Sequence, residues 1–313
     1  MPNIAADAGR FGHATVDDNL PTGFAGPGGL TGRALSPSDS AALCALSDEA
    51  GWNQTARDWA AMLSLGRGYA YWEANVPVAT ALALPYAPVA GRAERPIGFV
   101  SMVLTTARWQ RRGLARDLTQ RCVAALEAAG CVPALDATPA GREVYRTIGF
   151  ADGPGLDRWR AAAPTAPASS RADAVLRPIG MIAPALAALD ALCVGGARPA
   201  VLRELLARRP DLAWAAWRGG DLVGFCLGRD GRTATQIGPV IASDPAIGAV
   251  LIAQALARTR GPVIVDLMRT HGDIARLLAA AGFAPVREFT RMVRGGSVPA
   301  APALIAAAGP ELA

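Results

Sequence analysis

The sequence predicts an α/β protein in which a mixed α+β sheet fold occurs twice in tandem. Short apolar segments with strand character alternate with longer segments whose apolar residues recur at helical spacing. The order of these segments partly repeats in the second half of the chain. Gly149-Phe150 and Gly282-Phe283 are each followed, eight residues after the phenylalanine, by an arginine. This correspondence indicates an internal duplication.

Length and composition agree with two units. The chain has 313 residues, of which 51% are hydrophobic, so two cores of ordinary size can be buried. Residues 161–174 are rich in alanine, proline and serine and are expected to form a linker. We therefore expect a first unit at 33–160 and a second at 175–297. Residues 1–32 are expected as a flexible tail, and 298–313 as a C-terminal tail.

The first unit is expected to contain a strand, two helices, a hairpin and then a strand–helix–strand crossover. Ser36-Pro37 is typical of a helix start, and Gly51 ends that helix. The crossover makes its two strands parallel neighbours. The expected strands are 33–35, 69–73, 78–84, 97–104, 131–136 and 156–160, and the later helices are 54–65, 116–130 and the segment from Thr138 to Gly149.

The second unit is expected to follow a similar order. A second hairpin is predicted where two strand-like segments follow each other closely. The expected strands begin at 175–178 and continue at 212–217, 222–228, 235–240 and 263–267, and the expected helices are 183–193, 199–208, 246–258 and 273–281.

Several function classes are disfavoured by composition. The net charge of +5 comes from arginine alone, and the main arginine cluster, 108–116, is too local for a nucleic-acid duplex. The five cysteines are widely spaced in apolar contexts and are expected to be reduced, and two distant histidines suggest no metal site. The sequence shows no long apolar run and no signal-like start, so we expect a cytoplasmic protein without membrane or nucleic-acid partners.

The stretch 101–115 has the features of a phosphate-binding loop. Residues 102–104 have strand character, three arginines crowd the turn that follows, and Gly113 and Ala115 precede a helix. Backbone N–H groups at a helix start are unpaired and lie at the positive end of its dipole. Because small residues let an anion approach these groups, the stretch predicts a diphosphate site.

Residues 110–115, QRRGLA, resemble the acyl-CoA pyrophosphate loop of the GNAT superfamily of N-acyltransferases. That loop has Gln or Arg, two variable residues, Gly, one variable residue, and Gly or Ala. Tyr145, four residues before Gly149-Phe150, resembles the family's terminal Tyr and Gly-Phe element, and the order of elements agrees over about 33–160. The resemblance implies tandem GNAT-like domains and acetyl-CoA as the acyl donor.

The resemblance also assigns roles in the first unit. Residues 102–104 would bind the pantetheine arm, a backbone N–H near Val103 or Leu104 would stabilise the oxyanion, and Tyr145 would protonate the leaving thiolate. Thr138 takes the position of a CoA-contacting asparagine and is also typical of a helix N-cap. The donor-binding residues implied are Met102, Val103, Leu104, Gln110, Arg111, Arg112, Gly113, Leu114, Ala115 and Thr138.

The sequence leaves the general base and the acceptor site open. Glu73, Glu94 and Asp136 stand near predicted strands, and Ser101 could relay a proton through water. Asp136 is the first candidate for a catalytic base, because it ends a strand where sites on such sheets gather. The candidate acceptor-binding residues are Trp52, Asn53 and Glu73, although tryptophans at helix ends more often serve packing.

The second unit is expected to have lost its cofactor loop. The corresponding turn, IASDPAIGAV, has no arginine and contains Asp244 and Pro245. An aspartate repels phosphate, and a proline removes an N–H donor. Leu278 stands at the place of Tyr145. We therefore expect an inactive second unit that shapes the acceptor pocket of the first.

Together these features predict an acetyl-CoA-dependent N-acetyltransferase that transfers acetyl directly to a small-molecule amine, without a metal, as a monomer or homodimer. An alternative of a different class is a non-catalytic acyl-CoA-sensing or interaction module. Release of free thiol in the presence of amines distinguishes the two.

Overall fold

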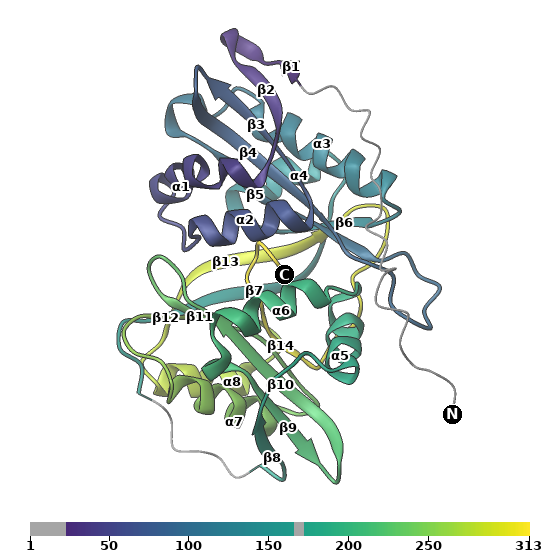
Figure 1. Ribbon diagram of the computed structural model, residues 1–313, viewed down its shortest axis with the longest axis vertical. Coiled ribbons are helices and arrows are strands. Elements are labelled where there is room, and N and C mark those ends of the chain that lie inside the picture. Colours follow the sequence, from purple (N-terminus) through teal and green to yellow (C-terminus); the bar gives the residue numbers. More distant parts are fainter. Residues whose placement is uncertain (1–22, 166–171) are drawn as a thin grey trace, which may run out of the picture.

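One mixed sheet runs through both halves of the chain. The computed structural model describes residues 23–165 and 172–313, so the expectations for 1–22 and for the linker residues 166–171 lie outside the described residues. The described strands form a sheet in the order β1-β2-β3-β4-β5-β6-β13-β7-β12-β14-β11-β10-β9-β8. Figure 1 shows the two halves at opposite ends of the long axis, with β13 and β7 crossing the middle. The predicted α/β class with a mixed sheet is confirmed.

The first half follows the predicted order of elements. Its helices and strands are β1 (Gly23–Ala25), β2 (Thr31–Leu35), α1 (Ser40–Glu49), α2 (Ala56–Leu65), β3 (Arg67–Glu73), β4 (Val76–Pro85), β5 (Ile97–Thr105), α3 (Leu114–Ala128), β6 (Val132–Ala137), α4 (Pro139–Arg146) and β7 (Ala151–Ala161). The predicted hairpin is β3–β4, and the predicted parallel pair is β5–β6.

Strand β4 is buried on both faces. Leu82 and Leu84 pack in one core with residues of α1 and α2, whereas Ala81 and Ala83 pack in another core with residues of α3. This alternation follows from the two-residue period of a strand. Helices therefore cover both faces of the first half of the sheet.

The expected N-terminal tail is wrong for residues 23–32. Strands β1 and β2 pair with each other, and β2 adds to the edge of the sheet along β3. Gly32 is needed there, because a Cβ at this position would lie 2.0 Å from the ring of Phe24. The glycine-rich composition indicated a mobile segment, but β3 offers a row of backbone groups to which these residues bind.

The second half repeats the order of the first. Its helices and strands are β8 (Val175–Pro178), α5 (Pro184–Val194), α6 (Pro199–Arg208), β9 (Trp214–Arg218), β10 (Asp221–Arg229), β11 (Thr235–Ala242), α7 (Pro245–Leu256), β12 (Val263–Met268), α8 (Gly272–Ala280), β13 (Ala284–Val293) and β14 (Leu304–Ala307). The predicted second hairpin is β9–β10.

The two halves exchange strands. Strand β13 of the second half lies between β6 and β7 of the first, and β7 in turn pairs with β12 of the second. Arg291 on β13 forms an ion pair with Asp136 on β6, and Arg158 on β7 forms one with Asp266 on β12, both with a shortest distance of 2.8 Å. The boundaries at 160 and 175 therefore do not separate two independent units.

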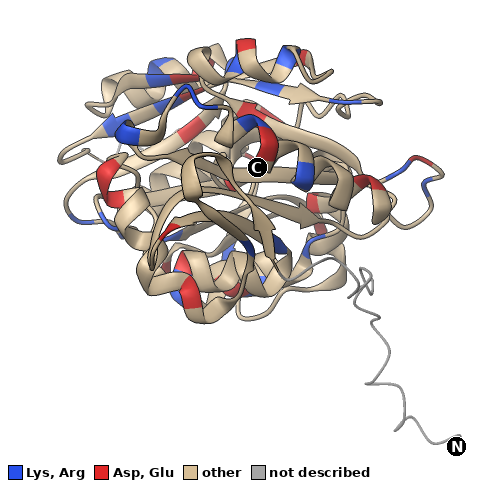
Figure 2. Ribbon diagram, turned by 90° about the horizontal axis from the view of Figure 1, so that it is seen from above, with Lys and Arg blue, Asp and Glu red and all other residues tan. Residues whose placement is uncertain are grey.

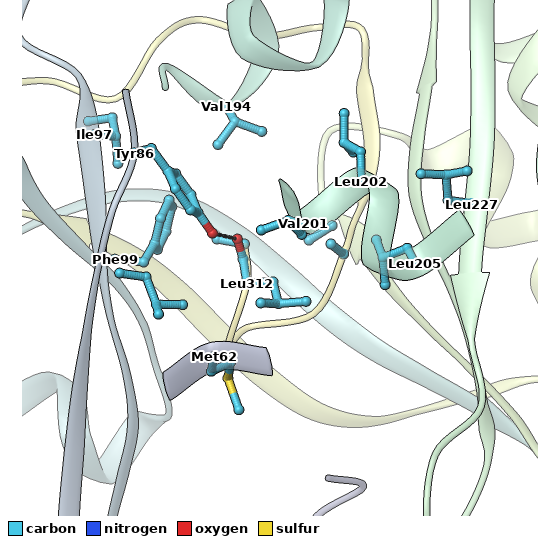
Figure 3. Close-up of a cluster of buried hydrophobic side chains, with 14 of the residues drawn as sticks. Met62, Tyr86, Ile97, Phe99, Val194, Val201, Leu202, Leu205, Leu227 and Leu312 are labelled. Carbon is cyan, nitrogen blue, oxygen red and sulfur yellow. Dashed lines mark hydrogen bonds between the residues drawn. The ribbon is translucent and has the colours of Figure 1, made fainter. Parts of the chain in front are cut away.

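The expected C-terminal tail, 298–313, is also wrong as a tail. Strand β14 lies between β11 and β12 and pairs with both, and Leu312 is buried in the core between the halves. Figure 3 shows Leu312 among side chains of both halves, with its carbonyl oxygen accepting a hydrogen bond from the hydroxyl of Tyr86 at 2.7 Å. Burial of apolar surface by these residues stabilises the junction.

Candidate active site

Strands β5 and β6 separate along their length. They pair in parallel only at 97–99 and 132–134, and beyond these residues the two backbones diverge. The expected pantetheine-binding residues 102–104 lie on the diverging part of β5. A gap between two parallel strands leaves backbone N–H and C=O groups available to a ligand.

A β-bulge lies in β5 at the point of divergence. Ser101 pairs with Leu82 and Leu104 pairs with Thr80, so two residues on β5 face one residue on β4. Met102, within the bulge, has a φ of 50°, and its carbonyl oxygen accepts a hydrogen bond from Thr80 Oγ1 at 2.8 Å. The bulge redirects the backbone toward the gap, where an N–H could stabilise developing negative charge.

The phosphate-loop features are present at the start of α3. Gly113 is the N-cap residue with a φ of 81°, and no side chain caps the helix. No described atom lies within 4 Å of the position that a Cβ of Gly113 would take. The first-turn N–H groups are therefore free of a side-chain cap, and the approach over Gly113 is open, as an anion site requires.

Glu73, the last residue of β3, contacts the turn before α3. Its carboxylate accepts hydrogen bonds from Arg108 at 3.0 Å and from Trp109 Nε1 at 3.3 Å, and the Arg112 guanidinium lies 4.6 Å from the centroid of the Trp109 ring. Glu73 does not line either cavity described below. The expected acceptor role of Glu73 is therefore corrected to one in positioning this turn.

Tyr145 on α4 faces the gap between the strands. Its ring is tilted against Phe150, with centroids 6.1 Å apart, and its hydroxyl has no hydrogen-bond partner among the described residues. Burial raises the pKa of Tyr145 above its ordinary value. The phenol therefore keeps its proton at ordinary pH. Thr138 caps the same helix, accepting from the Gly141 N–H at 3.3 Å.

A cavity, which we call the central cavity, joins these groups. An adjoining space, which we call the outer cavity, extends from it toward Gln110. The central cavity is lined by Trp52, Gln54, Val100, Ser101, Met102, Val103, Leu135, Asp136, Thr138, Tyr145, Arg158, Arg287, Phe289, Pro310 and Glu311. Both halves of the chain therefore build its walls.

Asp136 reaches the central cavity but is not free. Its two carboxylate oxygens accept hydrogen bonds from Nε and Nη2 of Arg291 at 2.8 and 2.9 Å, and both side chains are almost fully buried. Both oxygens of Asp136 are therefore already engaged by Arg291 within a buried ion pair. The expected role of Asp136 as a base is therefore corrected to that of a clamp between the halves. Glu94 is exposed and lines neither cavity.

Asn53 joins the two halves instead of facing the acceptor space. Its Oδ1 accepts hydrogen bonds from the backbone N–H groups of Thr233 and Ala234, and its Nδ2 donates to the Ala234 carbonyl at 3.0 Å. The side chain is 2% exposed. The predicted acceptor contact is therefore wrong for Asn53, whereas Trp52 does line both cavities.

Sequence reasoning missed several lining residues, among them Gln54, Arg287 and Glu311. Gln54 adjoins the predicted Trp52 and Asn53, so its position was a usable signal. Arg287 and Glu311 come from β13 and from the segment after β14. The carboxylate of Glu311 pairs with the buried Arg229. No local pattern could have placed these two beside Tyr145.

The corresponding gap in the second half is filled. Strands β11 and β12 pair in parallel only at 235–237 and 263–265, and β14 occupies the space where they diverge. At the start of α7, Asp244 Oδ1 accepts a hydrogen bond from the Ile247 N–H at 3.0 Å. The carboxylate of Asp244 therefore already occupies the N-terminus of this helix. Leu278, at the place of Tyr145, is fully buried. The second half thus offers neither the gap nor the open helix end.

Family models match both halves. A model of the acetyltransferase (GNAT) family matches residues 39–150, and one of an acetyltransferase (GNAT) domain matches residues 186–303. The chain belongs to the GNAT superfamily. It is a tandem-domain acyltransferase of this superfamily, and its fold supports N-acyl transfer from an acyl-CoA. None of the curated proteins compared matches this GNAT protein.

Solved structures share the tandem fold. A putative acetyltransferase from Pyrococcus horikoshii has a TM-score of 0.75 at 17% identity, over 96% of this chain and all of the other. A GCN5-related N-acetyltransferase from Sphaerobacter thermophilus has a TM-score of 0.61 at 18% identity, over 87% and 98% of the chains. A tandem GNAT protein from the clavulanic acid biosynthesis pathway has a TM-score of 0.57 at 15% identity, over 86% and 99%.

The remaining expectations concern charge, metals and membranes. Figure 2 shows basic and acidic residues interspersed over the outer helices and loops in that view. Among the described residues, no group of three or more His, Cys, Asp or Glu side chains could hold a metal ion. No helix in the described ranges is both long and apolar enough to cross a membrane. The five cysteines are free thiols, four of them buried.

Proposed function

We propose that the protein is an acetyl-CoA-dependent N-acetyltransferase that uses only its first half for catalysis. The observation that carries this proposal is the free hydroxyl of Tyr145, which lines the cavity formed where β5 and β6 diverge, beside the bulge at Met102. The open helix end at Gly113 would hold the diphosphate. These features fit an acyl-CoA, and their counterparts in the second half do not.

Different residues of the first half would perform different steps of the acetyl transfer. The backbone of the β5 bulge would orient the thioester and donate to the oxyanion that forms when the amine attacks its carbonyl carbon. As the carbon–sulfur bond breaks, Tyr145 would give its proton to the thiolate. Asp136 and Glu311 are both paired with arginines, so we assign neither as the base. The acetyl group passes directly to the nitrogen, which loses its extra proton to water, and Tyr145 would regain a proton from water after the thiol leaves.

The acceptor is proposed to be a small molecule. Strand β13 and residues 310–311 supply part of the wall of the central cavity, and a concave site with a few convergent polar groups is typical of small-molecule binding. This is the role proposed for the second half: it shapes the acceptor pocket. A cytoplasmic monomer or homodimer is part of the same proposal.

Calorimetry with acetyl-CoA tests donor binding. We expect one molecule bound per chain, and a Gly113→Glu substitution is expected to raise its Kd about 10-fold or more, because a carboxylate would stand at the phosphate position. Gly130→Glu is a matched control at the other end of α3. Gly113 and Gly130 have φ values of 81° and 74°, and no described atom lies within 4 Å of either Cβ position, so backbone strain is similar in both variants.

Two results would contradict this prediction. Absence of acetyl-CoA binding to the unmodified protein would remove the proposed function, and equal loss in both glycine variants would show that strain, not the phosphate site, caused the loss. The alternative function, a non-catalytic acyl-CoA sensor, shares the binding result. It is distinguished by turnover, because only an enzyme releases free thiol from acetyl-CoA faster when amines are added.

A further inference from the structure

One charged side chain of the central cavity makes no direct ion pair with a described residue. The ionisable residues lining this cavity are Asp136, Arg158, Arg287 and Glu311. Asp136, Arg158 and Glu311 form ion pairs with Arg291, Asp266 and Arg229, respectively. Arg287 forms no hydrogen bond or ion pair with any described residue. Arg287 is therefore the one charged residue of this lining that is not engaged in an ion pair with a described residue.

Arg287 is placed to contact a ligand. It lies on β13, is partly buried, and lines both the central and the outer cavity. Burial, and then the neighbouring positive charge of Arg158, lower the pKa of Arg287 from its ordinary value, although the carboxylate of Asp266 partly opposes this shift. A guanidinium in such surroundings is stabilised by an anion, which it can bind with two parallel hydrogen bonds.

Two buried oxygen atoms of the same cavity also have no partner. Neither Gln54 Oε1 nor Ser101 Oγ has a hydrogen-bond partner among the described residues, although the two side chains are only 2% and 4% exposed. A buried polar atom without a hydrogen-bond partner is energetically unfavourable. Both side chains line the central cavity, so a ligand with N–H groups would satisfy them.

We propose that the acceptor is an amine that also carries a carboxylate, such as an amino acid. Its carboxylate binds Arg287, and its amine nitrogen is held by the oxygen of Gln54, with the thioester on the β5 side of the cavity. The carboxylate is chosen over a phosphate because the lining offers one unpaired guanidinium, which matches one carboxylate. This inference rests on the proposed function and adds the substrate class.

Matched pairs of amines test this inference. Thiol release from acetyl-CoA is measured with L-amino acids, β-alanine and γ-aminobutyrate, each beside its carboxamide, and with ethanolamine phosphate. We expect at least one acid to be acetylated with a kcat/KM about 10- to 100-fold above that of its amide, because a charge-assisted contact is lost in the amide.

Three variants test which residue causes the preference for an acid over its amide. Arg287→Gln is expected to bring the acid and its amide to equal kcat/KM without changing the Kd of acetyl-CoA. Gln54→Leu is expected to lower kcat/KM for the acid and the amide alike. Arg177→Gln is the control, because Arg177 is an exposed arginine on β8, at the far edge of the sheet. Thermal denaturation verifies that each variant is folded.

The outcomes separate the inference from the proposed function. The inference is overturned if no carboxylated amine is acetylated, if amides or ethanolamine phosphate are preferred, or if acid preference survives Arg287→Gln. It is also overturned if Arg287→Gln weakens acetyl-CoA binding instead, since Arg287 would then be a donor contact. Acetyl-CoA binding by the unmodified protein, measured alone, decides the proposed function independently.

Discussion

Replacing Tyr145 by phenylalanine is expected to lower kcat about 10²- to 10⁴-fold, the range for loss of a positioned general acid. The ring and its contact with Phe150 remain, so the Kd of acetyl-CoA and the thermal stability should change little. The substitution removes only the hydroxyl group, whose proton we propose is transferred to the leaving thiolate. Steady-state thiol release and calorimetry on the same preparation provide the two measurements.

Tyr71→Phe is the matched control for this experiment. Tyr71 is also a tyrosine of the first half, but its hydroxyl donates to Asp117 at 2.8 Å and does not line the central cavity. Its loss is expected to cost about 1 kcal/mol of stability and to leave kcat unchanged. Equal activity of Tyr145→Phe and the unmodified enzyme would exclude the acid role.

The pH dependence of the enzyme follows from the same tyrosine. Because burial raises the pKa of Tyr145, the acid form persists as the pH rises past the usual range for a phenol. A rise of activity with pH should therefore report deprotonation of the acceptor amine. Below pH about 10, activity should not fall again, because Tyr145 keeps its proton over this range.

Arg291→Met is expected to lower the free energy of unfolding by about 3–5 kcal/mol, because it leaves the carboxylate of Asp136 buried without a partner. Asp136 is 0% exposed as a side chain and forms its ion pair with Arg291. Urea denaturation followed by circular dichroism measures the change. Combining Arg291→Met with Asp136→Leu should recover most of the loss, since two apolar residues can replace a buried ion pair.

The corresponding ion pair, between Arg158 and Asp266, allows the two losses of stability to be compared. Asp266 is paired with Arg158 and also accepts a hydrogen bond from Gln236 Nε2 at 2.6 Å. Arg158→Met should therefore destabilise the protein less than Arg291→Met, because Asp266 keeps a partner. A loss below about 1 kcal/mol for Arg291→Met, the range of exposed ion pairs, would contradict the proposed clamp between the halves.

The sequence alone determined the local features of the active half. The order of helices and strands in 33–160, the parallel β5–β6 pair, and Thr138 as a helix cap were all predicted and are confirmed. The open helix start at Gly113 also follows from residues adjacent in sequence. Such features depend on backbone conformation and capping over a few residues, so that a local pattern contains the information.

Only the tertiary structure decided how the halves combine. The pattern of the duplication revealed Arg158 and Arg291 but not that each pairs with an aspartate of the other half, since either strand could pair within its own unit or across. The same ambiguity made Asp136 resemble a free carboxylate. Strand pairing is formed by backbone groups that every residue carries, so composition does not specify the partner strand.

The residues proposed to bind the acceptor show most clearly that tertiary structure was needed to place them. Arg287 and Glu311 are far from Tyr145 in sequence, and their segments were predicted as the end of an inactive unit and a tail. The insertion of β14 between β11 and β12 fills the second gap and brings residues 310–311 to the central cavity. Long-range burial of apolar surface drives this arrangement. The sequence by itself therefore determined the open helix start that we propose binds the donor, and tertiary packing decided the cavity that we propose binds the acceptor.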